Sequence, residues 1–259
     1  MPWTTGTVTG HLELMTALRD FLTTDAGLVA AGQEWEVMKE ETIASHSMTS
    51  PNVPTPSGGW GATFRDLYLR GPGLAGLDNI HVNLRTYEAP SYNIYNWMVQ
   101  GATGFEDGVP WNRQPDNSWV SNEFHYLPMA NSTIKYWIVA DGRRFILVYK
   151  IGTRYLASYC GLLLPYATPS EYPYPMLISG TTSNDTYGVD HSTQSNFWRN
   201  ESGDPTMLRL RSGDWERVRH YWNTSISLSV WPWSQMAGIT TYYRLQGHPD
   251  GGFPLLPAI

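Results

Sequence analysis

Residues 132–164 read STIKYWIVADGRRFILVYKIGTRYLASYCGLLL and decide the fold. Two runs rich in β-branched and aromatic residues flank Asp141-Gly142, a dipeptide favoured in tight hairpin turns. Gly152 marks a second reversal, so the stretch predicts a three-stranded antiparallel meander. The central run, FILVYKI, is apolar at most positions, which predicts a strand in the middle of a sheet with cover on both faces.

Further strands are predicted on both sides of the meander because apolar residues alternate with polar ones. Upstream they are FRDLYLRG (64–71), NIHVNLRTYE (79–88) and YNIYNWMVQG (92–101). Downstream they are two short pieces within 205–223, then SISLSVWPW (225–233) and TTYYRLQG (240–247). The sequence therefore predicts a mainly β protein, in which an antiparallel β-sandwich domain occupies residues 62–259.

The first part of the chain has a different pattern. Leu14, Leu18 and Leu22 repeat with helical spacing, and Asp25 can cap a second short helix that ends near Gly32. We therefore expect a short helical N-terminal segment over residues 1–44. Residues 45–61 are rich in Pro, Ser and Gly, which is typical of a loop or linker.

Charge and composition exclude several classes of function. Charged residues make up 15% of the 259 residues, aromatic residues make up 14%, and the net charge is −6. Because the basic residues are dispersed, direct binding to nucleic acid is not expected. No run of about 20 apolar residues suggests a membrane span, and the N-terminus lacks the pattern of a signal peptide. The protein is thus expected to be made in a cytosol, where it is either kept or from which it is released by cell lysis.

No motif predicts a catalytic residue, a cofactor or a metal site. The seven histidines are spread singly, and the single cysteine, Cys160, is expected to be a buried, inert thiol. A glycoside hydrolase would need two carboxylates in an aromatic cleft, but spacing selects no pair. Carbohydrate binding without cleavage is a further alternative, in which Trp111 and Trp119 would stack on a sugar.

The stretch GLLLPYATPSEYPYPMLISG (161–180) follows the meander directly. Pro165 is expected to end strand pairing because it has no N–H to donate, and the later prolines favour extended backbone. A rigid arm over 165–175 is therefore predicted, either as a packed crossover or as a contact with a neighbouring subunit. The candidate interface residues are Pro169, Tyr172, Tyr174, Trp231 and Trp233.

Three stretches carry a resemblance to a known family: residues 14–38, residues 67–88 and, most specifically, ADGRRFILVYKIGTRYLASYCGLLLPYATPSEYPYPMLISG (140–180). They resemble structural proteins encoded among the late genes of tailed bacteriophages. The resemblance implies a non-enzymatic virion component of the tail, baseplate or neck. It implies other virion proteins as partners and several copies in a symmetric ring, and it brings no catalytic residues with it. The alternatives are a module that reads host surface glycan and, third, a cell-wall glycoside hydrolase.

Overall fold

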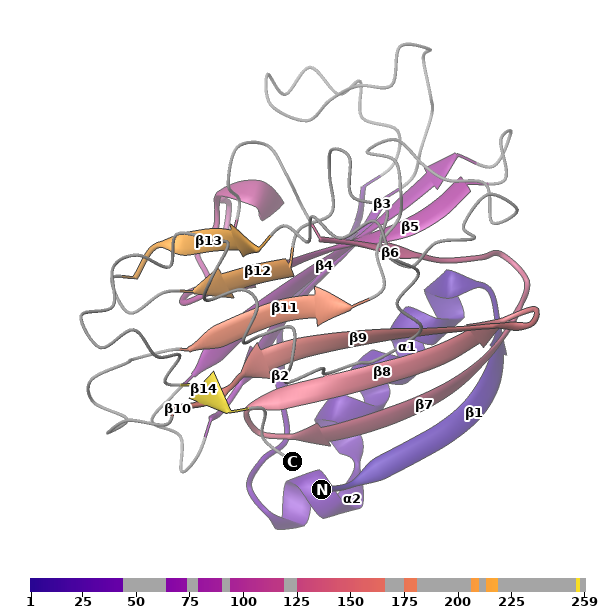
Figure 1. Cartoon of the computed structure of the whole chain (residues 1–259), viewed down its shortest axis with the longest axis horizontal. Helices are drawn as coiled ribbons and strands as arrows, with labels where there is room; N and C mark the ends of the chain where they lie inside the picture. Colours follow the sequence, from indigo (N-terminus) through magenta and orange to yellow (C-terminus); the bar gives the residue numbers. More distant parts are fainter. Residues whose placement is uncertain are drawn as a thin grey trace.

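A computed structural model describes residues 1–43, 64–73, 79–89, 94–118, 125–165, 175–180, 206–209, 213–218 and 255–256. Its strands form two antiparallel sheets that face each other across a common core (Figure 1). The strand order is β1-β7-β8-β9-β11-β12-β13 in the seven-stranded sheet and β2-β3-β4-β5-β6 in the five-stranded sheet. The predicted mainly β, antiparallel sandwich is confirmed.

The elements have the following bounds. The seven-stranded sheet contains β1 (Trp3–Thr9), β7 (Thr133–Asp141), β8 (Arg144–Ile151), β9 (Arg154–Leu162), β11 (Met176–Gly180), β12 (Thr206–Arg209) and β13 (Trp215–Val218). The five-stranded sheet contains β2 (Glu36–Ile43), β3 (Phe64–Gly71), β4 (Ile80–Ala89), β5 (Ile94–Ala102) and β6 (His125–Pro128). The helices are α1 (His11–Thr24), α2 (Ala26–Ala30) and a short 3-10 helix (Trp111–Arg113). A separate pair consists of β10 (Leu164–Pro165) and β14 (Leu255–Leu256).

The predicted meander is confirmed as β7, β8 and β9. Asp141 pairs with Arg144, so the first two-residue loop is Gly142-Arg143, and the Asp141 carboxylate accepts a 2.9 Å hydrogen bond from the Arg143 N–H. Gly152 opens the second loop with φ +59°. The prediction of full cover on both faces of β8 was wrong, because its outward side chains stay only half-buried.

Side chains from both sheets and from α1 fill the core. Two polar groups close hydrogen bonds inside it: the Tyr149 hydroxyl donates to the Pro128 carbonyl at 2.8 Å, and the Trp35 indole N–H donates to the Asp141 carbonyl at 2.9 Å. Cys160 is fully buried, as expected, and burial raises the pKa of its thiol to about 12. The Tyr149 bond matters most for the architecture because it joins β8 to β6 across the sandwich.

The N-terminal segment needs a correction. The two predicted helices form, and the Asp25 carboxylate caps α2 by accepting from the N–H groups of Gly27 and Leu28. However, β1 and β2 flank them, so residues 1–43 add an edge strand to each sheet instead of forming a helical segment of their own. The reason is that the β-branched run of β1 pairs with β7 over its whole length. Helix α1 then packs against β1, β7 and β2.

The second face of the five-stranded sheet also differs from expectation. Alternation in β4 predicted a half-exposed polar side, but Asn83 and His81 are buried there. On the same face the Arg85 guanidinium makes two hydrogen bonds, of 2.7 and 2.6 Å, to the buried carboxylate of Asp66. Because Arg85 also stacks over the Trp111 ring at 5.2 Å, the 3-10 helix covers this polar layer.

Buried His81 makes the fold acid-sensitive. Burial, together with the charge of Arg70, lowers the pKa of His81 from 6.5 to about 4. Between these two pH values the unfolded chain binds a proton that the folded chain does not. The contribution of His81 to the free energy of unfolding is therefore complete above pH 6.5 and is lost as the pH falls towards 4. We expect this one group to remove about 3 kcal/mol of unfolding free energy over that window.

Denaturant unfolding of the wild type and of His81→Gln at pH 7.0 and pH 4.5 measures this effect. The variant should keep most of its stability on acidification, whereas the wild type should lose it. An equal loss in both proteins would show that His81 is not the responsible group.

The structure contradicts one further prediction and confirms another. Strand β9 ends at Leu162, and Pro165 does not end strand pairing, because β10 pairs with β14 through Leu164–Leu256 and Pro165–Leu255. The two short strands predicted within 205–223 are confirmed as β12 and β13. The linker (45–61), the centre of the proline arm (166–174) and the strands expected at 225–233 and 240–247 lie outside the described residues.

Candidate interaction surface

The side of the seven-stranded sheet that faces away from the core carries aromatic and aliphatic residues. Strand pairing places them in three cross-strand rows, which we call the outer face. The rows are Thr7–Lys135–Lys150–Tyr155, Thr5–Trp137–Val148–Ala157 and Trp3–Val139–Ile146–Tyr159. The rows between them point inward and contain core residues such as Ile138 and Leu147. Outward and inward rows alternate because successive side chains of a strand leave the sheet on opposite sides.

The outer face is exposed at Trp3 of β1 and at Tyr155, near the start of β9, and it is buried further along β9. Trp3 is 67% exposed and Tyr155 is 45% exposed, whereas Ala157 and Tyr159 are buried. The rings of Trp137 and Tyr155 lie 5.9 Å apart at 31°. Large apolar side chains held open on a rigid sheet are typical of residues that contact a partner.

Two lysines give this surface its charge. The Lys135 ammonium lies 5.2 Å from the centre of the Trp137 ring, and the Lys150 ammonium lies 5.2 Å from that of Tyr155. The three rows contain no aspartate or glutamate. The outer face is therefore apolar with a positive fringe, and it fits a partner surface that is apolar with acidic or aromatic groups at its border.

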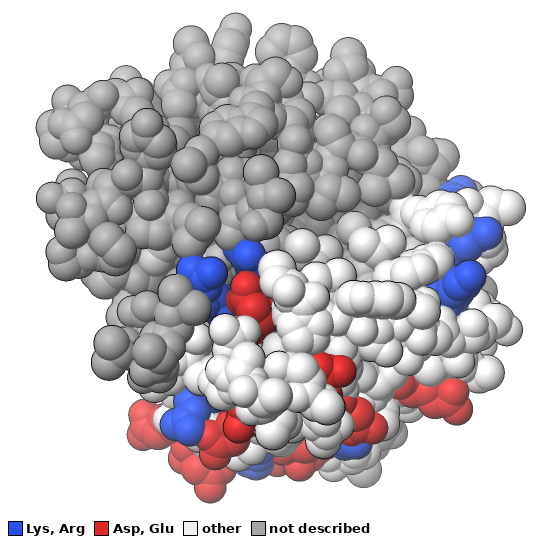
Figure 2. All heavy atoms as spheres, turned by 90° about the horizontal axis from the view of Figure 1, so that it is seen from below, with Lys and Arg blue, Asp and Glu red and all other residues white. Residues whose placement is uncertain are grey.

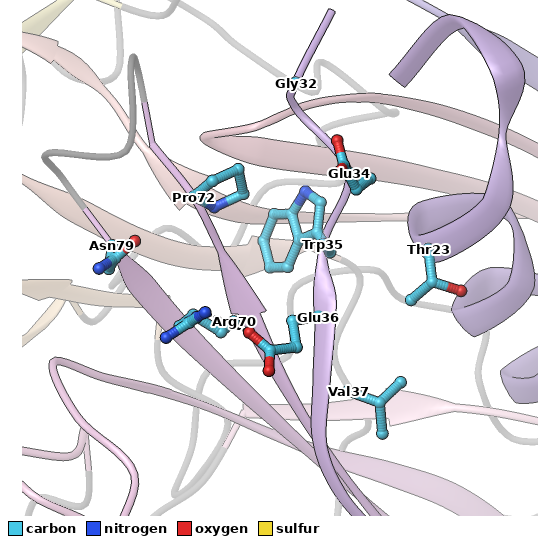
Figure 3. Close-up of a pocket in the computed structure, with 9 residues that line it drawn as sticks. All are labelled: Thr23, Gly32, Glu34, Trp35, Glu36, Val37, Arg70, Pro72 and Asn79. Atoms are coloured by element: carbon cyan, nitrogen blue, oxygen red, sulfur yellow. Dashed lines mark hydrogen bonds and ion pairs between the residues drawn. The ribbon is translucent and has the colours of Figure 1, made fainter. Parts of the chain in front are cut away.

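A hollow of about 690 Å³ lies where β2 and β3 approach the end of α1 (Figure 3). Trp35 occupies its middle, with Pro72 on one side and an ion pair between Arg70 and Glu36 on another. The indole is 2% exposed and its N–H is used by the Asp141 carbonyl, so it offers no open ring to a ligand. The hollow is lined by Thr23, Gly32, Glu34, Trp35, Glu36, Val37, Arg70, Pro72 and Asn79. Because Arg70 and Glu36 pair with each other and the indole is closed off, we do not take this hollow as the candidate site.

A second hollow, of about 490 Å³, contains an ion-pair network between α1 and the five-stranded sheet. Glu40 accepts hydrogen bonds from Arg19, at 2.7 Å, and from Arg65, at 2.6 Å. Burial alone would raise the pKa of Glu40, but the two arginines outweigh it and hold that pKa below its ordinary value. Since both guanidinium groups are engaged, the network ties the helix to the sheet and does not form a binding site.

Of the candidate contact residues predicted from the sequence, the structure describes only Trp111. Trp111 is 1% exposed under Arg85, which corrects its assignment as a sugar contact, because stacking on a sugar requires an open ring face. The remaining candidates lie outside the described residues: Trp119, Pro169, Tyr172, Tyr174, Trp231 and Trp233. In the described part of the chain, His, Cys, Asp and Glu form no group of three or more that could hold a metal ion.

The outer face was not predicted from the sequence. The stretch IKYWIV (134–139) is apolar or aromatic at alternate positions on both faces, so the pattern could not tell the inward residues from the outward ones. The available signal was Lys135, which lies two positions from Trp137 and therefore on the same face of the strand, because lysine side chains favour the solvent side.

Within the described ranges, no helix is long and apolar enough to cross a membrane. The chain matches no protein-family model and no curated protein sequence.

Proposed function

We propose that this protein is a structural subunit of a tailed-phage virion, in the tail, baseplate or neck, and that it acts through contacts with other virion proteins and with copies of itself. The observation that carries the proposal is the outer face, where Trp3, Trp137 and Tyr155 are presented on a seven-stranded sheet. The resemblance of residues 140–180 to late phage proteins supports the same role.

The physical argument rests on what assembly requires of a surface. A subunit of a particle needs contacts that are already in place before the partner arrives, because ordering flexible side chains on binding lowers affinity. Trp137 and Tyr155 contact each other and each stacks with a lysine, so their rings are held before any partner binds. Aromatic residues also dominate the binding energy of protein interfaces.

Complementation of a phage that lacks the gene tests the proposal. Tyr155→Glu with Lys150→Glu reverses the charge of the exposed corner of the outer face. We expect at least a tenfold loss of this variant from assembled particles and a matching fall in titre. Its unfolding temperature should stay close to that of the wild type, because Tyr155 lies at the surface.

The matched control is Val29→Glu, which places a glutamate on α2 at a side chain that is 50% exposed. This variant should enter particles normally. Normal incorporation of the outer-face variant as well would contradict the proposal that this surface is used in assembly.

A further inference from the structure

In the two large sheets, four of the described strands lie at the edges, and three of these are protected against pairing with another chain. Strand β2 carries Glu36, Lys39, Glu40 and Glu41 and has a bulge after Val37. Strand β6 has four residues and ends in Pro128, and β13 has only four residues. Charges, bulges, proline and shortness all block the addition of a further strand.

Strand β1 has none of these protections. It is seven residues long, WTTGTVT, without a charge, a proline or a bulge, and it pairs with β7 in continuous register. Figure 2 views the molecule from below, the side on which β1 and α2 lie in Figure 1, and shows a wide uncharged area among the described residues. A strand edge of this length and composition is a ready template for pairing.

The hydrogen bonds at the two ends of β1 show which of its groups face outward. The Pro2 carbonyl accepts from the Ala140 N–H at 3.1 Å, and the Gly10 N–H donates to the Ser132 carbonyl at 2.8 Å. Along a strand, the backbone N–H and C=O groups of successive residues point to opposite edges. In β1 the groups of the even-numbered residues therefore bond to β7, and those of the odd-numbered residues point outward from the open edge of the sheet. The Thr9 N–H is already satisfied by the Glu13 carboxylate at 2.7 Å. Within the described part of the chain, no bond occupies the N–H and C=O groups of Trp3, Thr5 and Thr7, so these groups remain open.

We propose that β1 pairs antiparallel with β1 of a second copy of the chain, with Thr5 opposite Thr5 of the partner on a two-fold axis. In this register Trp3 lies opposite the partner's Thr7, so every open N–H and C=O group of the three residues finds a mate. A register centred on Gly6 would instead set Trp3 against the partner's Thr9, whose N–H is taken. The Thr5-centred register thus pairs all the open N–H and C=O groups of Trp3, Thr5 and Thr7.

The side chains favour a second copy as the partner. A strand without charges meets no repulsion from its own copy, and threonines paired across strands stabilise a sheet. Trp3 of one copy lies opposite the partner's Thr7, an uncharged residue, so the exposed indole packs against a threonine and meets no like or unpaired charge on the partner's edge strand. The same surface patch is used by both copies, as a two-fold interface requires.

Sedimentation and disulfide trapping test the register. The wild type should sediment as a dimer, and Thr5→Cys should form a disulfide between copies on oxidation, since residues that exchange hydrogen bonds lie about 5.5 Å apart at Cα. Thr7→Cys should not, because its copies would be separated by about four strand positions, roughly 14 Å. Cys160 is buried and will not interfere.

Thr5→Pro supplies the second variant. Proline removes an N–H that points away from the sheet, so the pairing of β1 with β7 is retained while the dimer is weakened by at least about tenfold. Thr5→Val, which keeps the N–H, should remain dimeric. A monomeric wild type, a Thr7→Cys disulfide, or a dimer indifferent to Thr5→Pro would overturn the inference.

This inference deepens the proposed assembly role, and the two can fail separately. If Thr5→Pro is monomeric and enters particles as well as the wild type, the dimer is not needed and the structural role stands. If the wild type dimerises through β1 yet is absent from particles, the pairing stands and the proposed function fails.

Discussion

Replacing Tyr149 with alanine is expected to lower the free energy of unfolding by about 4 kcal/mol, as for other large aromatic residues in cores. The ring is fully buried in β8, and its hydroxyl supplies the 2.8 Å bond to the Pro128 carbonyl of β6. Truncation would leave a cavity between the sheets and an unsatisfied carbonyl in the core. Equilibrium denaturation in urea measures the effect.

Two variants separate the parts of this effect. Tyr149→Phe removes only the hydroxyl and should lower the unfolding free energy by about 1.5 kcal/mol. Tyr155→Ala deletes the same type of side chain from the exposed face of the next strand and should cost less than about 1 kcal/mol. If the two alanine variants were equally stable, the packing of the sheets described above would be incorrect.

Gly161→Ala is expected to destabilise the protein by about 4 kcal/mol, through two separate causes. Its φ of +145° is unfavourable for any residue with a Cβ, and a Cβ built there would lie 2.4 Å from the Arg143 carbonyl oxygen and from the Arg144 Cα. These are backbone atoms, so no side-chain rotation relieves the clash, and β8 and β9 must separate where they pair.

Gly152→Ala is the matched control. This glycine also has a positive φ, of +59°, but nothing lies within 4 Å of the added Cβ. Only the backbone preference is lost, which costs about 1 kcal/mol. Thermal unfolding of both variants therefore separates conformational strain from close approach, and similar melting temperatures would contradict the strand pairing at Gly161.

Much of the fold could be predicted from the sequence because turn-forming residues mark the ends of the strands of the meander. Gly152 lies in the second turn, and the Asp141-Gly142 dipeptide begins one residue before the first two-residue loop, Gly142-Arg143. Helix α1 was predictable because Leu14, Leu18 and Leu22 lie on its buried face. These turns and this helix depend on residues close together in the sequence, so a local pattern is enough to predict them.

What could not be predicted depends on contacts between distant segments. The run TTGTVT has ordinary strand propensity, but its place at the edge of the seven-stranded sheet follows only from its pairing with β7, more than 120 residues away. The same holds for the polar side of β4, which is buried because the 3-10 helix folds over it. Alternation in one strand cannot show what another segment covers.

The candidate site was harder still. The sequence suggested Trp111 as a contact residue, but this side chain is buried in the interior. Trp137 was not predicted to face outward, because its sequence neighbours Tyr136 and Ile138 are also apolar or aromatic. Abundant tryptophan shows that large apolar surfaces exist, but strand register decides which of them face outward.

Under the proposal that the gene belongs to a tailed phage, quantitative mass spectrometry of purified, salt-washed particles of that phage tests the central claim most directly. If the protein is a structural subunit, its peptides will be present in a constant number of copies per particle, in fixed ratio to the other virion proteins. If they stay in the lysate and are missing from the particles, the protein is not a virion component.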